Sequence, residues 1–183
     1  KRVERAIELA RAIQMPCTLL VSHATSDEGS EYRDYLADYA RIMGVRLVLA
    51  EGRFNHHRGT NDDGRPIYAL ADAYSEADLV TYPSRVEGFG NAFLEAIYHR
   101  RPLMMSSYEI FKTDIQPKGF EVIAFGEFVS HETAARARAV LDDPASAQEM
   151  IERNYRLGRL HYSYTVLRNR LEYVMQQTVG QQY

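Results

Sequence analysis

Two carboxylates flank a glycine-rich turn near the middle of the chain. Glu87 comes directly before the sequence Gly88-Phe89-Gly90, and Glu95 follows with seven residues between the two acids. The glycines allow positive φ angles and let a ligand approach the backbone closely. A helix that begins at such a turn presents free N–H groups and the positive end of its dipole, which favour an anion such as phosphate. The stretch therefore indicates a ligand site.

The two acids suit hydroxyl groups better than they suit the phosphate itself. Glu87 would repel a phosphate at short range, so it is better used as an acceptor for sugar hydroxyls. Glu95 lies about one turn inside the expected helix, where its carboxylate can accept two hydrogen bonds from vicinal hydroxyls, as on a ribose. Asn91 or Gly90 is positioned to cap this helix. A phosphate on the amides with hydroxyls on both acids describes a nucleotide sugar.

An ordinary structural explanation fits the same residues. Acids in the first turn of a helix are favoured by the dipole alone, and glycines after a strand are common turn residues. Phe89, Phe93 and Leu94 are expected to pack rather than to stack on a ligand. The turn residues by themselves leave both explanations open, because a short motif depends on its context.

The elements around the turn alternate between short apolar runs and amphipathic segments. Strands are expected over 18–21, 45–50, 78–83, 103–106 and 121–125, and helices over 2–14, 32–43, 67–74 and 91–99, with one more between Ser130 and Asp143-Pro144 and helical structure over the last forty residues. This alternation predicts an α/β fold, an open parallel Rossmann-like sheet with helices on both faces that ends in long C-terminal helices. The first strand reads as one covered on both faces. Ligands of such sheets bind beyond the carboxyl ends of the strands, where the turn at 84–91 lies.

Composition limits the classes of function. The chain has 183 residues, and residues 1–183 are expected to form a single domain. A net charge of −3 argues against a nucleic-acid-binding protein. The single Cys17 excludes an internal disulfide, fits a reducing, cytoplasmic location and is expected to be buried and inert. No apolar run is long enough for a transmembrane segment, and no signal-peptide pattern is present. The chain begins at Lys1 rather than at Met and is expected to be a piece of a longer polypeptide.

Two loops are expected in the first half of the chain. One is the polar stretch 22–29, and the other, 51–66, is the least structured part of the sequence. His56 and His57 are adjacent, so their side chains diverge, and they are expected to be solvated rather than to bind a metal. Asp62-Asp63-Gly64 indicates a turn, because the remaining spacing of a calcium-binding loop is absent. No metal site is predicted.

The context of the turn resembles the signature of retaining GT-B glycosyltransferases. More narrowly, it is similar to the large group 1 family, glycosyltransferase family 4, which includes relatives of sucrose-phosphate and glycogen synthases, and the two acids match its Glu-x7-Glu motif. The resemblance covers the whole chain as that family's C-terminal, donor-binding domain. The segment from Phe111 to Phe120 resembles members that make glycerate-linked or sucrose-like glycosides. The matching residues are Pro83-Ser84, Glu87-Gly88-Phe89-Gly90, Leu94-Glu95-Ala96, Pro102, the segments Tyr68 to Asp78 and Asn154 to Met175, and His161-Tyr162-Ser163 within the latter.

The resemblance implies a role for each motif residue. Glu87 is the catalytic candidate and would contact hydroxyls of the donor hexose. The backbone of Gly88, Phe89, Gly90 and Asn91 would approach the sugar and the diphosphate, and Glu95 would bind the ribose hydroxyls. Lys1 falls where the family has a diphosphate-binding lysine. The implied partners are a nucleoside diphosphate sugar as donor and the protein's own N-terminal GT-B domain, with no metal and no cofactor.

Two departures from the family pattern affect the expected structure. Arg100 stands where the family has a glycine at the end of a helix, which predicts a different helix ending without loss of the donor site. The family's first strand in this domain, central in the order 3-2-1-4-5-6, and the N-terminal acceptor domain are expected to be missing from this sequence. The alternatives are a GT-B nucleotide-sugar epimerase, a phosphorylase-like domain, and a non-catalytic regulatory module on the same fold. Intact Glu87 and Glu95 argue against the last of these.

Overall fold

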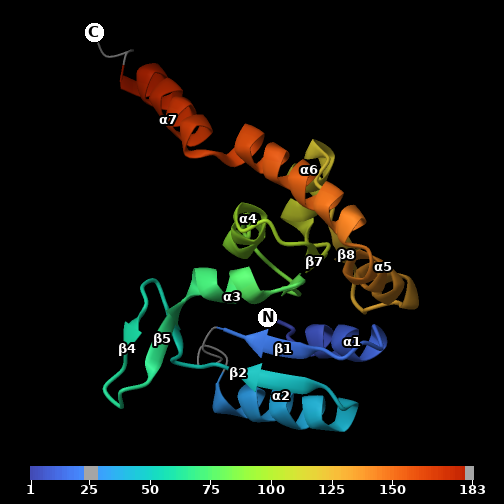
Figure 1. The fold of residues 1–183 in the computed structure, drawn as a ribbon. Helices are drawn as coiled ribbons and strands as arrows, with labels where there is room; N and C mark the ends of the chain where they lie inside the picture. Colours follow the sequence, from blue (N-terminus) through green and yellow to red (C-terminus); the bar gives the residue numbers. More distant parts are fainter. Residues whose placement is uncertain (23–28, 180–183) are drawn as a thin grey trace.

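The computed structural model describes residues 1–22 and 29–179 (Figure 1). The polar loop expected over 22–29 lies, apart from its two ends, outside the described residues. No described helix is long and apolar enough to span a lipid bilayer. The chain begins with α1 (Glu4–Ala12), β1 (Thr18–Val21), α2 (Ser30–Met43) and β2 (Arg46–Leu49).

Strands β1 and β2 form a parallel two-stranded sheet. Helices α1 and α2 both pack on the face of this sheet that carries Leu19 and Val21. Because side chains alternate between the faces of a strand, Leu20 points the other way and is 41% exposed. The expectation that this strand is covered on both faces is therefore wrong. Cys17, just before β1, is exposed, so its expected burial is wrong as well, although partial burial raises the pKa of its thiol.

The segment expected to be the least structured, 51–66, contributes two strands to a small sheet of three. The three strands are β3 (Phe54–Asn55), β4 (Gly59–Thr60) and β5 (Pro66–Ala69), with β5 in the middle. A turn closes the ribbon, because the Asn61 carbonyl accepts from the N–H of Gly64 and its side chain accepts from the N–H of Arg65 at 2.8 Å. Strand β5 takes the residues expected to begin a helix, so α3 (Leu70–Glu76) starts later than predicted.

The second half contains the larger parallel sheet. It is formed by β6 (Val80–Tyr82), β7 (Leu103–Ser106) and β8 (Ile123–Phe125), and β7 lies at the centre with all four residues buried. Helix α4 (Asn91–Tyr98) connects β6 to β7, and α5 (His131–Asp142) packs against β8 and β7 through Ala134, Ala137 and Val140. Between β7 and β8 lie a π-helical turn (Phe111–Ile115) and a 3-10 turn (Gln116–Lys118).

The parallel strands β1 and β2 and the parallel strands β6, β7 and β8 form two separate sheets. Within the described residues, β1 and β6 are edge strands that do not hydrogen-bond to each other. In the strand order that the resemblance implies, the missing first strand belongs between these two edges. The two separate parallel sheets are what that order leaves when its central strand is absent, and the domain boundaries stay a prediction.

Two long helices follow the sheet, as predicted. They are α6 (Pro144–Tyr162), which the Asp143 carboxylate caps, and α7 (Tyr164–Val179). Helix α6 crosses α4 and α5, and its buried Asn154 exchanges two hydrogen bonds with the backbone of Glu121 at 2.8 and 2.6 Å. Helix α7 extends away from the body of the domain (Figure 1).

The end of α4 corrects the expectation for Arg100. This residue has φ +55°, the left-handed conformation that glycine adopts at helix ends. The N–H of Arg100 bonds to the Ile97 carbonyl and the N–H of Arg101 to the Ala96 carbonyl, which is the Schellman pattern. The helix therefore ends in the usual way despite the side chain. The Arg100 guanidinium pairs with Glu152 and lies 4.1 Å from the ring centroid of Tyr155, contacts that offset part of the backbone strain.

Candidate functional site

The glycine-rich turn lies at the carboxyl end of β6, as the sequence predicts. The strand ends at Tyr82, and the buried Pro83 and Ser84 lead into the turn. Gly90 is the N-cap of α4, so of the two capping residues considered, Gly90 takes the position and Asn91 is the first helical residue, with its side chain exposed. Among the described residues, the backbone N–H groups of Asn91 and Ala92 have no hydrogen-bonded acceptor. These two groups point out of the helix end and suit an anion.

The two glycines of the turn have different roles. Gly90 has φ +95°, and a Cβ atom there would lie 2.7 Å from the hydroxyl oxygen of Tyr108 and 3.0 Å from the ring of Tyr82. Gly88 has no positive φ angle, and no atom lies within 4 Å of its Cβ position. Of these two glycines, only Gly90 is therefore required by the backbone of the turn, and the positive φ angle that glycine allows is used at Gly90 but not at Gly88. The open space around Gly88 still allows a ligand to approach.

Lys1 and Glu87 are 86 residues apart in the sequence and meet at the turn. The Lys1 Nζ atom lies 3.5 Å from Oε1 of Glu87. Burial alone would raise the pKa of the Glu87 carboxyl, but hydrogen bonding from Tyr82 and the Lys1 charge outweigh burial and lower this pKa. The buried Ser84 hydroxyl also lies near enough to favour the charged carboxylate, although it forms no well-aligned hydrogen bond among the described residues. Glu87 is therefore an anion at neutral pH.

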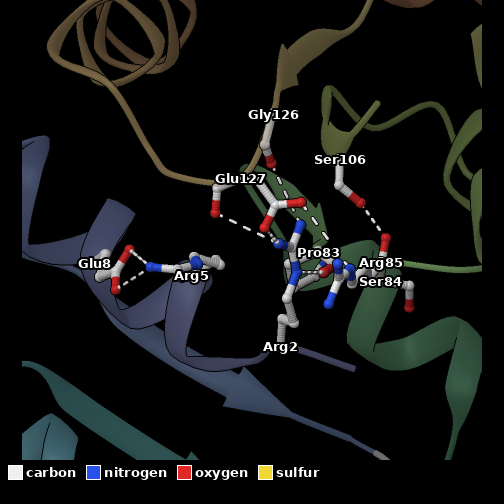
Figure 2. Close-up of polar contacts among 9 residues, drawn as sticks. All are labelled: Arg2, Arg5, Glu8, Pro83, Ser84, Arg85, Ser106, Gly126 and Glu127. Carbon is white, nitrogen blue, oxygen red and sulfur yellow. Dashed lines mark hydrogen bonds and ion pairs between the residues drawn. The ribbon is translucent and has the colours of Figure 1, made fainter. Parts of the chain in front are cut away.

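Arg2 explains why Lys1 reaches the turn. Figure 2 shows its guanidinium directed at the segments that follow directly after β6 and β8. It donates to the carbonyls of Pro83 at 3.4 Å and Gly126 at 3.3 Å, and pairs with the Glu127 carboxylate at 3.1 Å. On the same edge, the Ser106 hydroxyl at the end of β7 donates to the Ser84 carbonyl (Figure 2). These bonds join the start of α1 to the strand ends beside the turn. Nothing in the residue pattern around Arg2 predicted this contact.

Two tyrosines, Tyr82 and Tyr108, pack against the turn beside Gly90. The Tyr108 hydroxyl donates to the carbonyl of Phe89 at 2.7 Å, and its ring lies perpendicular to that of Tyr82, with centroids 6.4 Å apart. Burial and the Glu87 charge raise the pKa of Tyr108 to about 12 and also raise that of Tyr82, so both hydroxyls stay protonated. The Phe89 ring packs against Tyr162, with centroids 4.9 Å apart, which confirms that it is a packing residue. Sequence reasoning missed both tyrosines, because one lies inside a strand and the other in an irregular segment.

Glu95 lies on α4 and is half-buried. Its Oε2 atom accepts a hydrogen bond of 2.9 Å from the hydroxyl of Tyr74, on α3. The Tyr74 ring stacks on His99, with centroids 4.8 Å apart and the planes 8° from parallel. Burial is the main cause that lowers the pKa of His99, which keeps the imidazole neutral at pH 7. Periodicity placed Tyr74 only on the apolar face of a helix and gave no sign of its contact with Glu95.

A metal site is absent from the described residues. No group of three or more His, Cys, Asp or Glu side chains within residues 1–22 and 29–179 is arranged to hold an ion. His56 and His57 are both exposed, at the edge of the small sheet.

The site thus combines three features at one edge of the larger sheet. A helix N-terminus with free N–H groups and the Lys1 ammonium favour an anionic group, and two oriented carboxylates can accept hydrogen bonds from hydroxyls. The expected residues Lys1, Glu87, Gly88, Phe89, Gly90 and Asn91 come together at the turn, and Glu95 follows one helical turn later.

Two curated relatives carry the same name. The chain is 42% identical over 105 residues to the mannosylglucosylglycerate synthase of Petrotoga mobilis, and 31% identical over 158 residues to that of Thermotoga maritima. The matches cover 57% and 79% of this chain but only 24% and 34% of the relatives. The chain therefore spans about a quarter to a third of their length. No family model matches the chain.

Solved structures share the fold. S. aureus TarM, in a complex with Fondaparinux, alpha-GlcNAc-glycerol and UDP, matches with a TM-score of 0.66 at 15% identity, over 94% of this chain and 32% of its own. WaaG, a glycosyltransferase involved in lipopolysaccharide biosynthesis, matches with a TM-score of 0.61 at 19% identity, over 91% of this chain and 41% of its own. The resemblance to GT-B glycosyltransferases is confirmed for the fold.

Proposed function

We propose that this chain is the donor-binding domain of a retaining glycosyltransferase of the group 1 family, glycosyltransferase family 4, in which a hexose passes from a nucleoside diphosphate sugar to a hydroxyl acceptor. The observation that carries the proposal is the meeting of Lys1 and Glu87, 3.5 Å apart, at the N-terminus of α4. A cation and free helix N–H groups stabilise the charge that grows on a departing diphosphate. An ionised acid beside them can bind the hydroxyls of the sugar that is transferred.

Each of the predicted residues has a place in this proposal. Lys1 and the N–H groups at Asn91 hold the diphosphate, and the open backbone at Gly88 admits the sugar. Glu87 accepts hydrogen bonds from the hexose and Glu95 from the ribose. Neither acid is assigned as a covalent nucleophile. The proposal includes no metal ion and no cofactor, and the acceptor side of the site belongs to an N-terminal GT-B domain.

The relatives suggest where to look for the substrates. Both are named for the synthesis of mannosylglucosylglycerate, so this compound is the first product to be tested. Synthase relatives also favour a transferase over the epimerase, phosphorylase and regulatory alternatives. The single Cys17 and a nucleotide-sugar donor both fit the cytoplasm.

Titration calorimetry of the full-length protein with UDP, GDP and ADP tests the donor site. We expect one of the three to bind and expect Glu95→Ala to weaken its binding by about tenfold, roughly the effect of one hydrogen bond to a charged group. Binding of none of the three by folded protein would exclude a nucleotide-sugar site. Unchanged affinity in Glu95→Ala would remove Glu95 from it.

A further inference from the structure

The contact between Tyr74 and Glu95 fixes one oxygen of the acid. The Tyr74 hydroxyl donates to Oε2 of Glu95 at 2.9 Å, from the short helix α3 to the longer α4. Within the described ranges, no donor is hydrogen-bonded to Oε1 of the same carboxylate. A phenol has a single O–H to donate, whereas a carboxylate has about four acceptor positions. Glu95 therefore keeps acceptor capacity while its orientation is set.

The Tyr74 side chain, which donates this hydrogen bond, is fixed by its surroundings. Tyr74 is 9% exposed and belongs to the largest buried cluster, where its ring stacks on His99 at the end of α4. Burial, with the Glu95 charge as the next cause, raises the pKa of the Tyr74 hydroxyl. The phenol is therefore protonated at neutral pH and acts as a donor to the carboxylate. A glutamate without such a partner has several rotamers of similar energy, and binding would have to order it.

We propose that Tyr74 is a positioning residue for ribose recognition: by holding Oε2 of Glu95, it presents Oε1 of that carboxylate to the vicinal hydroxyls of the donor nucleotide. This inference rests on the proposed function. One carboxylate oxygen can accept from two neighbouring hydroxyls, so both the 2′- and the 3′-hydroxyl contribute to the contact. Tyr74 does not touch the nucleotide. It acts by fixing the orientation of the Glu95 carboxylate before the nucleotide binds.

A purely structural role makes a different prediction. Tyr39 and Glu8 form a comparable phenol–carboxylate bond of 3.2 Å between α2 and α1, away from the turn. If Tyr74 only joined α3 to α4, its loss would lower stability as the loss of the Tyr39 hydroxyl does. It would not change how the protein distinguishes a ribose from a deoxyribose. Tyr39→Phe is therefore the matched control.

The test is calorimetry of the full-length protein with UDP, GDP and ADP and with the 2′-deoxy and 3′-deoxy forms of each. We expect the wild type to bind the ribose form of one nucleotide at least about tenfold more tightly than its deoxy forms, the effect of one hydrogen bond to a charged group. In Tyr74→Phe this ratio should fall to about threefold or less, mainly through weaker binding of the ribose form, because an unheld carboxylate must be ordered on binding. Tyr39→Phe should keep the wild-type ratio.

Each outcome bears on the inference. An unchanged ratio in folded Tyr74→Phe overturns the positioning role and leaves the donor site standing, and so does an equal fall in Tyr39→Phe. A wild type that binds a nucleotide without distinguishing the deoxy forms overturns the ribose contact itself. Absence of any nucleotide binding overturns the proposed function and this inference with it. If Tyr74→Phe fails to fold, p-aminophenylalanine in place of Tyr74 supplies a weaker hydrogen-bond donor of the same shape. An intermediate ratio of ribose to deoxy affinity in that variant supports the positioning role, and an unchanged ratio overturns it.

Discussion

The hydroxyl oxygen of Tyr108 lies 2.7 Å from the point at which Gly90 would carry a Cβ atom. The same hydroxyl donates to the Phe89 carbonyl, one residue before Gly90. The tyrosine can therefore hold the turn only because residue 90 has no side chain. Gly88, two residues earlier, has no such neighbour. The glycine that shapes the turn and the glycine that leaves space for a ligand are different residues.

Alanine substitutions separate these two roles. We expect Gly90→Ala to lower the free energy of unfolding by about 2 kcal/mol or more, since a left-handed backbone costs a side chain roughly 1–2 kcal/mol before any clash. Gly88→Ala should leave stability within about 0.5 kcal/mol of the wild type but weaken nucleotide-sugar binding. Urea denaturation and calorimetry measure the two effects. Equal stability of the two variants would contradict the geometry of the turn.

The left-handed Arg100 offers a test of backbone strain. We expect Arg100→Gly to be more stable than Arg100→Ala by roughly 1 kcal/mol, because both lose the contacts with Glu152 and Tyr155 and only glycine relieves the strain. Thermal unfolding of the pair gives the difference directly. If alanine proves equal to or better than glycine, the helix does not end in the Schellman conformation.

His99 predicts a pH dependence of stability. Burial is the main cause that lowers the pKa of His99 in the folded protein; the Glu95 charge opposes this by raising the pKa, and the Arg101 charge lowers it further. The unfolded chain, with a histidine pKa of about 6.5, then binds the proton more readily. The contribution of His99 is therefore complete above about pH 6.5 and is lost as the pH falls below it. We expect a smaller fall in melting temperature between pH 7.5 and 5.5 in His99→Gln than in the wild type.

The control for this experiment is His131→Gln, which changes an exposed histidine at the start of α5. Its melting temperature should follow the wild-type pH profile. A profile of His99→Gln that cannot be told from those of the wild type and the control would show that His99 takes up its proton in the folded state without cost.

Lys1 should contribute to binding through its charge. We expect Lys1→Met to weaken binding of a nucleoside diphosphate by about tenfold and to reduce the dependence of this affinity on salt, because one ammonium–phosphate interaction is lost. Lys1→Arg should retain most of the affinity. The measurement is calorimetry of the full-length protein at two salt concentrations. An affinity of Lys1→Met equal to that of the wild type at low salt would place the diphosphate elsewhere.

The periodicity of apolar residues, together with residues that begin or end helices, was sufficient to predict most of the fold. The helix predicted over 32–43 ends at Gly44 in the left-handed conformation. The helix predicted between Ser130 and Asp143-Pro144 is capped by Ser130 and ends before Pro144, where α6 begins. These signals are local, because a cap or a helix stop depends on a few neighbouring residues. The small sheet at 54–69 was missed because its strands are two to four residues long and their pairing depends on contacts across the ribbon.

The motif of the candidate site is visible in the sequence, but the residues that position the motif are not. The order of Glu87, the glycine turn and Glu95 suggested hydroxyl and phosphate binding, but these residues alone left an ordinary structural explanation open, and the family resemblance of their context decided between the two. Arg2, Tyr74 and Tyr108 act through contacts with residues distant in sequence, and such contacts leave no periodic signal. Arg100 was misjudged for a related reason. Glycine is preferred in the left-handed position that follows a helix, but contacts of the Arg100 side chain with α6 offset part of the backbone strain at this residue.

The most direct test is a transfer assay with the full-length protein, supplied with UDP-, GDP- and ADP-linked hexoses and with several hydroxyl acceptors, in which mannosylglucosylglycerate is the first product sought and the anomeric configuration of the product is read by nuclear magnetic resonance. We expect that one donor is consumed, that the new glycosidic bond keeps the configuration of the donor, and that Glu87→Gln loses most of the transfer while still binding the nucleotide. Inverted configuration, or full transfer by Glu87→Gln, would contradict the proposed function.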